Sequence, residues 1–275
     1  RSLPATKNVP KEMLPIYRKP IVQYVVEEAM EAGISSVVFI TNQTKRVIED
    51  HFDHNLLLED VLRDAGKTEL LNEVRQVAEM VDFVSIRQKH QLGLGHAVLC
   101  AREACQHEPF AVMLGDDLLF GRGSGLGQLI EVAHSNNAAV VGVIEVPEDK
   151  VSRYGIIDGV EYGPGVYKVH RLVEKPKKQD APSRLAIIGR YVLLPEIFDI
   201  LEKQQAGVGG EIQLTDALQG LADQGKLLAV KMRGQRFDAG DWVEYLTANI
   251  YFALQDEDLH DDLVERMRLL LPRRR

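Results

Sequence analysis

The segment "FAVMLGDD" (residues 110–117) decides the fold class of this chain. An apolar run from Phe110 to Leu114 ends at Gly115 and is followed directly by Asp116 and Asp117. A short apolar run bounded by turn residues is typical of a strand that is buried on both faces, as in α/β proteins. Ligands of open α/β sheets bind beyond the carboxyl ends of the strands. We therefore interpret 110–117 as a core strand that carries two carboxylates to a ligand-binding edge.

The segments on either side alternate between helical and strand patterns. Residues 20–33 have apolar side chains at helical spacing, with a proline at the start and a glycine at the end. We expect helices over 20–33, 45–52, 96–105, 124–134, 195–203, 211–224 and 241–255, one or two more over 56–79, and strands over 35–41, 82–88, 110–117, 138–146, 185–193 and 226–234. This alternation predicts an α/β fold with βαβ units around a mainly parallel sheet.

The pattern changes after residue 150. Residues 154–176 are β-rich and interrupted by glycines, which predicts a smaller antiparallel region with tight turns. No boundary is visible before about residue 256, where the amphipathic and then basic tail "HDDLVERMRLLLPRRR" follows. We expect one catalytic domain over 1–255 and a helical, basic tail over 256–275.

Composition excludes several classes of protein. The formal net charge of −8 over 275 residues argues against general nucleic-acid binding. Cys100 and Cys105 are too few for a disulfide framework and lack zinc-site spacing. No apolar run approaches the roughly 20 residues that cross a bilayer. We expect a cytoplasmic protein without a nucleic-acid or membrane partner.

Two aspartates are candidate metal ligands. Mg²⁺ needs one or two protein carboxylates and takes its other ligands from phosphates and water. Asp116 is favoured over Asp117 because it comes first after the glycine, although a plain Asp-Asp turn would give the same pattern. In "RFDAGDW" (236–242), Asp241 reads as a helix N-cap, whereas Asp238 has no evident structural role. Asp238 is therefore the candidate for a second ligand.

Two further motifs combine glycines or charges with strand ends. "RQKHQLGLGHA" (87–97) has Gly93 and Gly95 before a helix, a pattern that permits close approach of a ligand but also fits a plain turn. Val98 breaks the dinucleotide-binding pattern, so a nicotinamide cofactor is not expected. In "VEKP" (173–176) an extended backbone would point Glu174 and Lys175 to opposite faces, where they would address different parts of a ligand or simply be solvated.

The first residues gather cations on a stiff loop. "RSLPATKNVPKEMLP" (1–15) places Arg1, Lys7 and Lys11 among prolines that prevent an ordinary helix. "GEIQLTDAL" (210–218) is unusually polar for a helix start. Each of these motifs is ambiguous when it is taken alone, and their order along the chain is more informative.

That order resembles the bacterial UTP–glucose-1-phosphate uridylyltransferases, of the sugar-nucleotide pyrophosphorylase group, over about residues 1–255. The matching motifs are "LPATKNVPKEMLP", "KP", "RQ…GLGHA", "LGDD", "YG", "VEKP", "LAIIGRY", "GEIQLTDA" and "FDAGD". The resemblance implies a Rossmann-like, three-layer αβα nucleotidyltransferase fold with a mixed, mainly parallel sheet. The family begins with a β-strand and a glycine-rich loop ending Gly-Thr-Arg, and Arg1 stands where that arginine would be. We expect this strand and loop to precede Arg1 in the whole protein.

The resemblance also implies roles at matching positions. It assigns catalysis to cations that neutralise pyrophosphate or hold the sugar phosphate, nucleotide binding to a base-reading loop, sugar binding to the 155–187 region, and Mg²⁺ to the two aspartates. By role these are Arg1, Lys11 and Lys175 (catalytic); Gln88, Gly93 and Asp116 (nucleotide); Gly155, Glu174, Lys175 and Ile187 (sugar); Asp116 and Asp238 (metal).

The implied reaction joins UTP and glucose 1-phosphate to give UDP-glucose and pyrophosphate. A thymidylyltransferase of the same fold, a UDP-sugar-using glycosyltransferase and a non-catalytic nucleotide-sugar subunit are the alternatives. Glycosyltransferases usually carry an Asp-x-Asp triplet, whereas the two aspartates of "LGDD" are adjacent. The family is typically oligomeric, and Leu269–Leu271 could serve an interface, fold back on the domain or belong to a disordered end.

Overall fold

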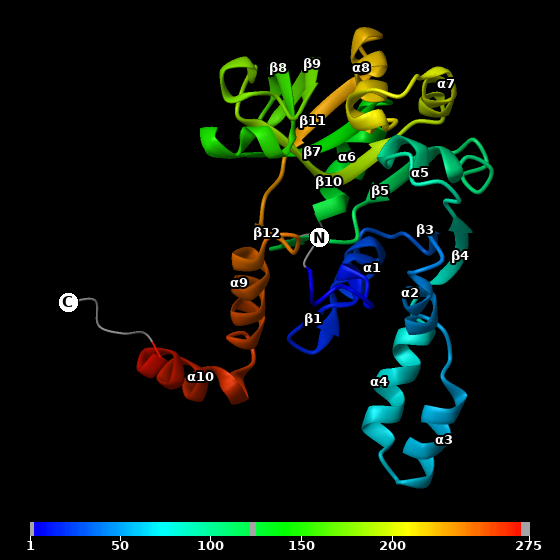
Figure 1. Ribbon diagram of the computed structural model, residues 1–275, viewed down its shortest axis with the longest axis vertical. Coiled ribbons are helices and arrows are strands. Elements are labelled where there is room, and N and C mark those ends of the chain that lie inside the picture. The colour runs from blue at the N-terminus through cyan, green and yellow to red at the C-terminus, as the bar shows by residue number, and fades with distance from the viewer. Residues whose placement is uncertain (1–2, 122–124, 271–275) are drawn as a thin grey trace.

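The computed structural model describes residues 3–121 and 125–270 (Figure 1). The helices are α1 Ile21–Glu31, α2 Arg46–His51, α3 Leu56–Asp64, α4 Thr68–Ala78, α5 Leu94–Cys100, α6 Gly125–Asn136, α7 Glu196–Lys203, α8 Leu214–Asp223, α9 Trp242–Ala253 and α10 Glu257–Leu270. The strands are β1 Pro15–Ile16, β2 Lys19–Pro20, β3 Ser36–Thr41, β4 Asp82–Arg87, β5 Phe110–Met113, β6 Asp117–Phe120, β7 Ala139–Glu145, β8 Gly155–Gly163, β9 Val166–Glu174, β10 Leu185–Leu193, β11 Leu227–Lys231 and β12 Gln235–Asp238. The expected helices and strands are confirmed within a few residues at their ends, except that the strand expected over 110–117 ends at Met113 and Asp117 begins another strand, β6.

The central sheet has six strands in the order β5-β10-β7-β11-β9-β8. Strands β5, β7, β11 and β8 run in one direction, and β10 and β9 run against them. Strand β10 separates β5 from β7, and strand β9 separates β11 from β8. Most of the strands that share a direction are therefore not hydrogen-bonded to each other. Among the described strands of this sheet, β7 and β11 are the parallel neighbours. The mixed sheet and its antiparallel β8–β9 region are confirmed, but the expectation of a mainly parallel sheet is wrong, because the other neighbouring pairs described in this sheet are antiparallel.

Side chains of the sheet alternate between two cores, which explains the continuous apolar runs in the sequence. Val141 of β7 packs with α5, α7 and α8, whereas the adjacent Val140 packs with α6 and α1. Ile187 and Ile188 of β10 divide in the same way between the two faces. Helices therefore cover both faces of the sheet, and the expected three-layer αβα arrangement is confirmed.

A second body of structure lies below this sheet in Figure 1. Helix α1, the antiparallel pair β6–β12 and helix α9 share a core that includes Ile21, Leu118 and Phe237. The parallel pair β3–β4 lies beside α1, and helices α3 and α4 project from it as a hairpin. None of the described helices is both long enough and apolar enough to span a bilayer.

A buried ion pair holds the two bodies together. Arg190 of β10 is 1% exposed, and its guanidinium donates to both carboxylate oxygens of Glu28 of α1 at 2.6–3.1 Å. Arg190 also donates to the backbone oxygens of Asp117 and Gly189, and Glu28 accepts the amide of Leu126 at the start of α6. One paired charge thus joins β10, α1, β6 and α6.

We expect Glu28→Gln to lower the free energy of unfolding by about 3–5 kcal/mol, because it leaves the buried guanidinium without a counter-charge. Urea denaturation followed by circular dichroism measures this loss. The control is Glu31→Gln at the exposed end of the same helix, with an expected change within about 0.5 kcal/mol. Equal effects of the two variants would contradict a structural role for the buried pair.

Candidate functional site

The two adjacent aspartates face different environments. Asp117 is buried, accepts two hydrogen bonds from Arg236 at 2.7 and 3.0 Å, and accepts the amide of Gly189 at 2.9 Å. The side chain of Asp116, by contrast, is 22% exposed. Asp117 begins β6, whereas Asp116 lies in the turn after β5. Asp116 is therefore the carboxylate that a ligand can reach.

Lys11 lies directly against Asp116. It belongs to the short 3₁₀ turn Lys11–Met13, and its ammonium donates a hydrogen bond to a carboxylate oxygen of Asp116. Burial opposes the charge on Lys11, but the carboxylate of Asp116 outweighs burial and raises the pKa of the ammonium above its usual value. The basic loop and the "LGDD" motif thus meet, as their predicted roles require. Arg1 lies outside the described residues.

Asp238 lies on the same edge. It is paired in register with Asp117 across β12–β6, and its Oδ1 accepts the amide of Gly240 at 2.9 Å. The expectation that Asp238 has no structural role is therefore wrong, because it closes this turn. A Cβ added at Gly240 would lie 3.0 Å from Oδ1 of Asp238 and 3.9 Å from Oδ2 of Asp116. The two predicted metal ligands thus flank one glycine.

Three of the four residues predicted to bind the sugar meet at the start of β8. Gly155 is paired with Glu174 in the β8–β9 register. A Cβ at Gly155 would lie 3.1 Å from Oε2 of Glu174, 3.2 Å from Oγ1 of Thr215 and 3.3 Å from Cδ1 of Ile187. Thr215 donates to Glu174 at 2.7 Å and adds a hydroxyl to the cluster. A side chain at position 155 would press against all three neighbours, which fits the glycine found there.

Lys175, the fourth residue, departs from the predicted geometry. Its ammonium lies 3.3 Å from Oε1 of Glu174, so the expectation that the two side chains point to opposite faces is wrong. Strand β9 ends at Glu174, and Lys175 has a left-handed backbone with φ of 44°. The strand alternation of side chains between two faces therefore ends at Glu174 and does not include Lys175. The amide of Lys175 donates to the backbone oxygen of Tyr154 at 3.0 Å, which holds this conformation.

The residues predicted to read the base form a compact loop. The side-chain amide of Gln88 donates to the backbone oxygen of Gly93 at 3.1 Å. Gly93 has φ of 98°, and a Cβ there would lie 2.8 Å from Cβ of Glu211 and 2.9 Å from the backbone oxygen of Ile212. The space that glycine provides is thus occupied by the 211–212 segment of the chain itself. The contact of Gln88 and Gly93 with a base stays a prediction.

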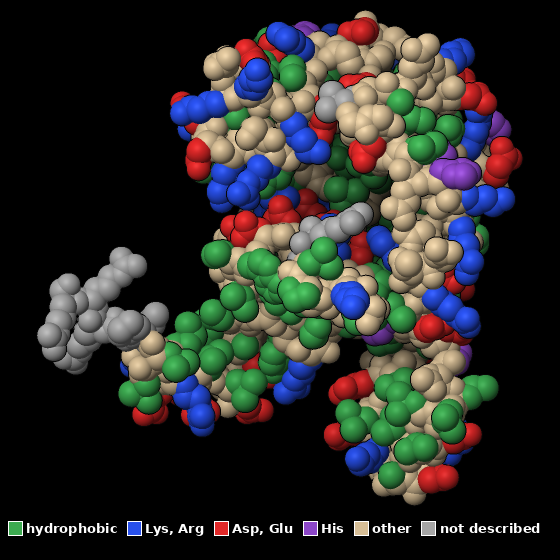
Figure 2. Space-filling model, in the orientation of Figure 1, with side chains coloured by type: hydrophobic (Ala, Val, Ile, Leu, Met, Phe, Trp, Pro, Cys, Tyr) green, Lys and Arg blue, Asp and Glu red, His purple; other side chains and the backbone are tan. Residues whose placement is uncertain are grey.

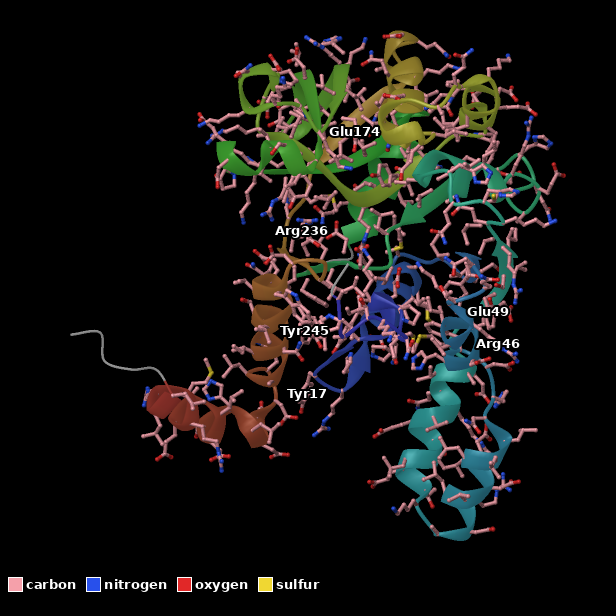
Figure 3. The ribbon with its side chains drawn as sticks, viewed as in Figure 1. Tyr17, Arg46, Glu49, Glu174, Arg236 and Tyr245 are labelled. Carbon is pink, nitrogen blue, oxygen red and sulfur yellow. The ribbon has the colours of Figure 1, made fainter. Side chains whose placement is uncertain are left out.

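Arg236 joins the two halves of the site and was missed in the sequence. In Figure 3 it lies between the sheet body that carries Glu174 and helix α9, which carries Tyr245. The only signal for it was its position two residues before Asp238 on a short strand, which places both side chains on one face. Figure 2 shows the molecule hollowed in this region, with side chains of both charges around the hollow.

Comparisons with known proteins identify the family of this chain. Residues 1–254 match the model of the nucleotidyl transferase family. The UTP–glucose-1-phosphate uridylyltransferase of Bacillus subtilis is 50% identical over 271 residues, which are 98% of this chain and 93% of the relative.

Two solved structures are also similar. A structure described as UTP-bound UGPase from Acinetobacter baumannii has a TM-score of 0.89 at 39% identity, with 98% of this chain and 94% of that chain covered. A UDP-glucose pyrophosphorylase complexed with UDP-glucose has a TM-score of 0.84 at 40% identity, with 93% and 95% covered. The chain belongs to the nucleotidyl transferase family and, within it, to the UTP–glucose-1-phosphate uridylyltransferases.

Proposed function

We propose that this chain transfers the uridylyl group of UTP to glucose 1-phosphate, giving UDP-glucose and pyrophosphate. The observation that carries the proposal is a pair of charged groups that Arg236 and Tyr154 connect, since Arg236 lies beside Asp238 and Tyr154 accepts the amide of Lys175. One group is Lys11, Asp116 and Asp238, and the other is Glu174 with Lys175. Relatives named for this reaction, at 50% identity over nearly the whole chain, support it.

The reaction needs little proton transfer. A phosphate oxygen of glucose 1-phosphate attacks the α-phosphorus of UTP, a new P–O bond forms, and the bond to pyrophosphate breaks with its electron pair on the departing oxygen. The nucleophile is already ionised near neutral pH, because the second pKa of a phosphate monoester is about 6. The barrier therefore lies in bringing two anions together, and catalysis depends on positioning and charge neutralisation.

Each half of the site would handle one anion. Lys11 would neutralise the departing pyrophosphate, and the resemblance gives Arg1 the same role. Lys175 would hold the phosphate of the sugar, and Glu174 would accept hydrogen bonds from its hydroxyls. Gly155 and Ile187 would form the wall against which the sugar ring rests, because they already lie beside Glu174.

The carboxylates of Asp116 and Asp238 fit Mg²⁺. They offer hard oxygen donors on either side of Gly240. The described residues contain no cluster of three or more His, Cys, Asp or Glu side chains able to hold a metal. Two carboxylates suit a cation that takes its remaining ligands from phosphates and water. Such a cation would withdraw charge from the α-phosphorus when it is bound.

The C-terminal helices favour a homo-oligomer. Trp242, Val243, Leu246 and Ile250 form an exposed apolar stripe along α9, with Val243 71% exposed. Figure 2 shows hydrophobic side chains gathered over α9 and α10. Leu269 and Leu270 of α10 are each 80% exposed, whereas Leu271 lies outside the described residues. A continuous apolar stripe of this kind marks an interaction surface.

The domain boundary at residue 255 and the cytoplasmic location of the protein stay predictions.

The function is tested by measuring pyrophosphate release with four nucleotides and several sugar phosphates. We expect release with UTP and glucose 1-phosphate, and its loss when EDTA removes divalent cations. Preference for dTTP would favour the thymidylyltransferase, and consumption of UDP-glucose without pyrophosphate would favour a glycosyltransferase. A chain that binds UTP but releases no pyrophosphate would contradict the proposal.

We expect Asp116→Ala to lower turnover by at least about 10²–10³-fold, because the carboxylate at the reacting phosphates is lost. Initial rates at saturating substrates measure the effect. Asp82→Ala is the control, since Asp82 is an exposed carboxylate at the first residue of β4. Full activity of Asp116→Ala in the presence of Mg²⁺ would remove Asp116 from the site.

We expect Leu246→Glu to shift the chain to its monomer mass of 30.8 kDa in light scattering, because a charge would interrupt the apolar stripe of α9. The control is Val61→Glu, an equally exposed apolar position on the α3–α4 hairpin, since Val61 and Leu246 are both 57% exposed. A wild-type chain that is itself a monomer would contradict the proposed oligomer.

A further inference from the structure

Arg236 of β12 contacts two other segments of the fold as well as Asp238 on its own strand. Its Nε and Nη2 donate to the two carboxylate oxygens of Asp117, and Nη2 also lies 3.8 Å from Oδ2 of Asp238. Its Nη1 donates to the hydroxyl of Tyr154 at 3.3 Å, and the guanidinium carbon lies 5.3 Å from the centre of the Tyr154 ring. The side chain is 13% exposed. One planar cation therefore spans β6, β12 and the residue before β8.

Tyr154 connects Arg236 to the residues that are predicted to bind the sugar phosphate. Its backbone oxygen accepts the amide of Lys175, which holds Lys175 in its left-handed conformation. Its next residue is Gly155, which packs against Glu174. The ring and hydroxyl of Tyr154 thus face Arg236, while its backbone faces the lysine. Movement of this tyrosine would move the predicted ligand of the sugar phosphate.

We propose that Arg236 and Tyr154 act as a positioning pair that sets the separation between the Asp116–Asp238 carboxylates and Lys175. This inference rests on the proposed function of those residues. The pair does not touch the reacting atoms and acts through the residues on either side of it. The two carboxylates and the lysine come from different bodies of the fold, so a rigid connection between them determines how two bound anions are aligned.

The chemistry of arginine suits this task. A planar guanidinium can hold a carboxylate with two parallel hydrogen bonds and still stack on an aromatic ring. The guanidinium of an arginine is not deprotonated in proteins, so the cation at this position is permanent. A lysine at this position would reach one of the partners and leave the others unheld. Misplacement of a reacting group by about 1 Å can cost roughly 10² in rate.

The most conservative test is Tyr154→Phe, which removes one oxygen and keeps the ring. We expect kcat/KM for glucose 1-phosphate to fall about tenfold, with KM for UTP unchanged within about twofold, because the pair acts on the sugar half. The control is Tyr162→Phe, since Tyr162 is 65% exposed on the same β8 strand. A tenfold rise in KM for UTP as well, or an unchanged kcat/KM for glucose 1-phosphate, would overturn the proposal.

A second variant tests the arginine. We expect Arg236→Lys to lower kcat/KM by about 10²-fold, whereas Arg233→Lys, an exposed arginine three residues earlier, should change it less than about twofold. Circular dichroism establishes whether Arg236→Lys folds, and Tyr154→Phe alone decides the matter if it does not. Normal kinetics in a folded Arg236→Lys variant would overturn the proposal.

A double-mutant cycle separates positioning from a general structural effect. If Tyr154 acts through Lys175, Tyr154→Phe should change the rate less than about twofold in a Lys175→Ala background. An undiminished tenfold loss in that background would overturn the proposal. The wild-type chain is assayed first. Absence of pyrophosphate release would contradict the proposed function and the positioning pair together, whereas normal release with unaffected variants would contradict the pair alone.

Discussion

The pairing of buried charges at the junction of the two bodies is the constraint on which the site depends. Arg190 and Arg236 each bring a permanent cation into low-dielectric surroundings, and each is matched by a carboxylate, Glu28 or Asp117. Arg190 also binds the backbone oxygen of Asp117, so the two pairs meet at one residue. A buried charge without its partner is strongly destabilising, which makes the relative placement of β6, β10, β12 and α1 nearly obligatory. The site is built on that placement.

The two adjacent aspartates, Asp116 and Asp117, have different roles in the site. Asp117 faces inward and holds the framework, while Asp116 faces the edge and meets Lys11. Neither could take the place of the other, because one needs a buried guanidinium and the other needs access for a ligand. The two aspartates of "LGDD" thus place a buried structural carboxylate and an accessible carboxylate next to each other in the sequence. Asp238 does both within a single side chain, since it closes the turn at Gly240 and still lies beside Asp116.

Most of the fold could be predicted because burial on both faces leaves continuous apolar runs such as 138–146, and helices leave a 3.6-residue repeat. Strands β6 and β12 were missed, since four residues carry no usable period. The order of the motifs predicted the residues that meet at Gly155. It did not predict the contact of Glu174 with Lys175, which depends on one left-handed residue that only tertiary contacts impose. Arg236 was missed for a similar reason, because its partners lie 82 and 119 residues away in the sequence.

An acidic protein that binds two phosphate compounds needs cationic side chains placed locally at its site. The net charge of −8 would repel a nucleotide triphosphate if the charges were spread evenly. Instead, Lys11 and Lys175 each lie against a carboxylate on opposite sides of the site, so each cation is held in place by a neighbour. An ammonium fixed in this way loses little further side-chain entropy when an anion arrives. The carboxylates of Asp116 and Glu174 therefore hold the two ammonium groups, and the buried pairs at Asp117 and Glu28 fix the elements around the site.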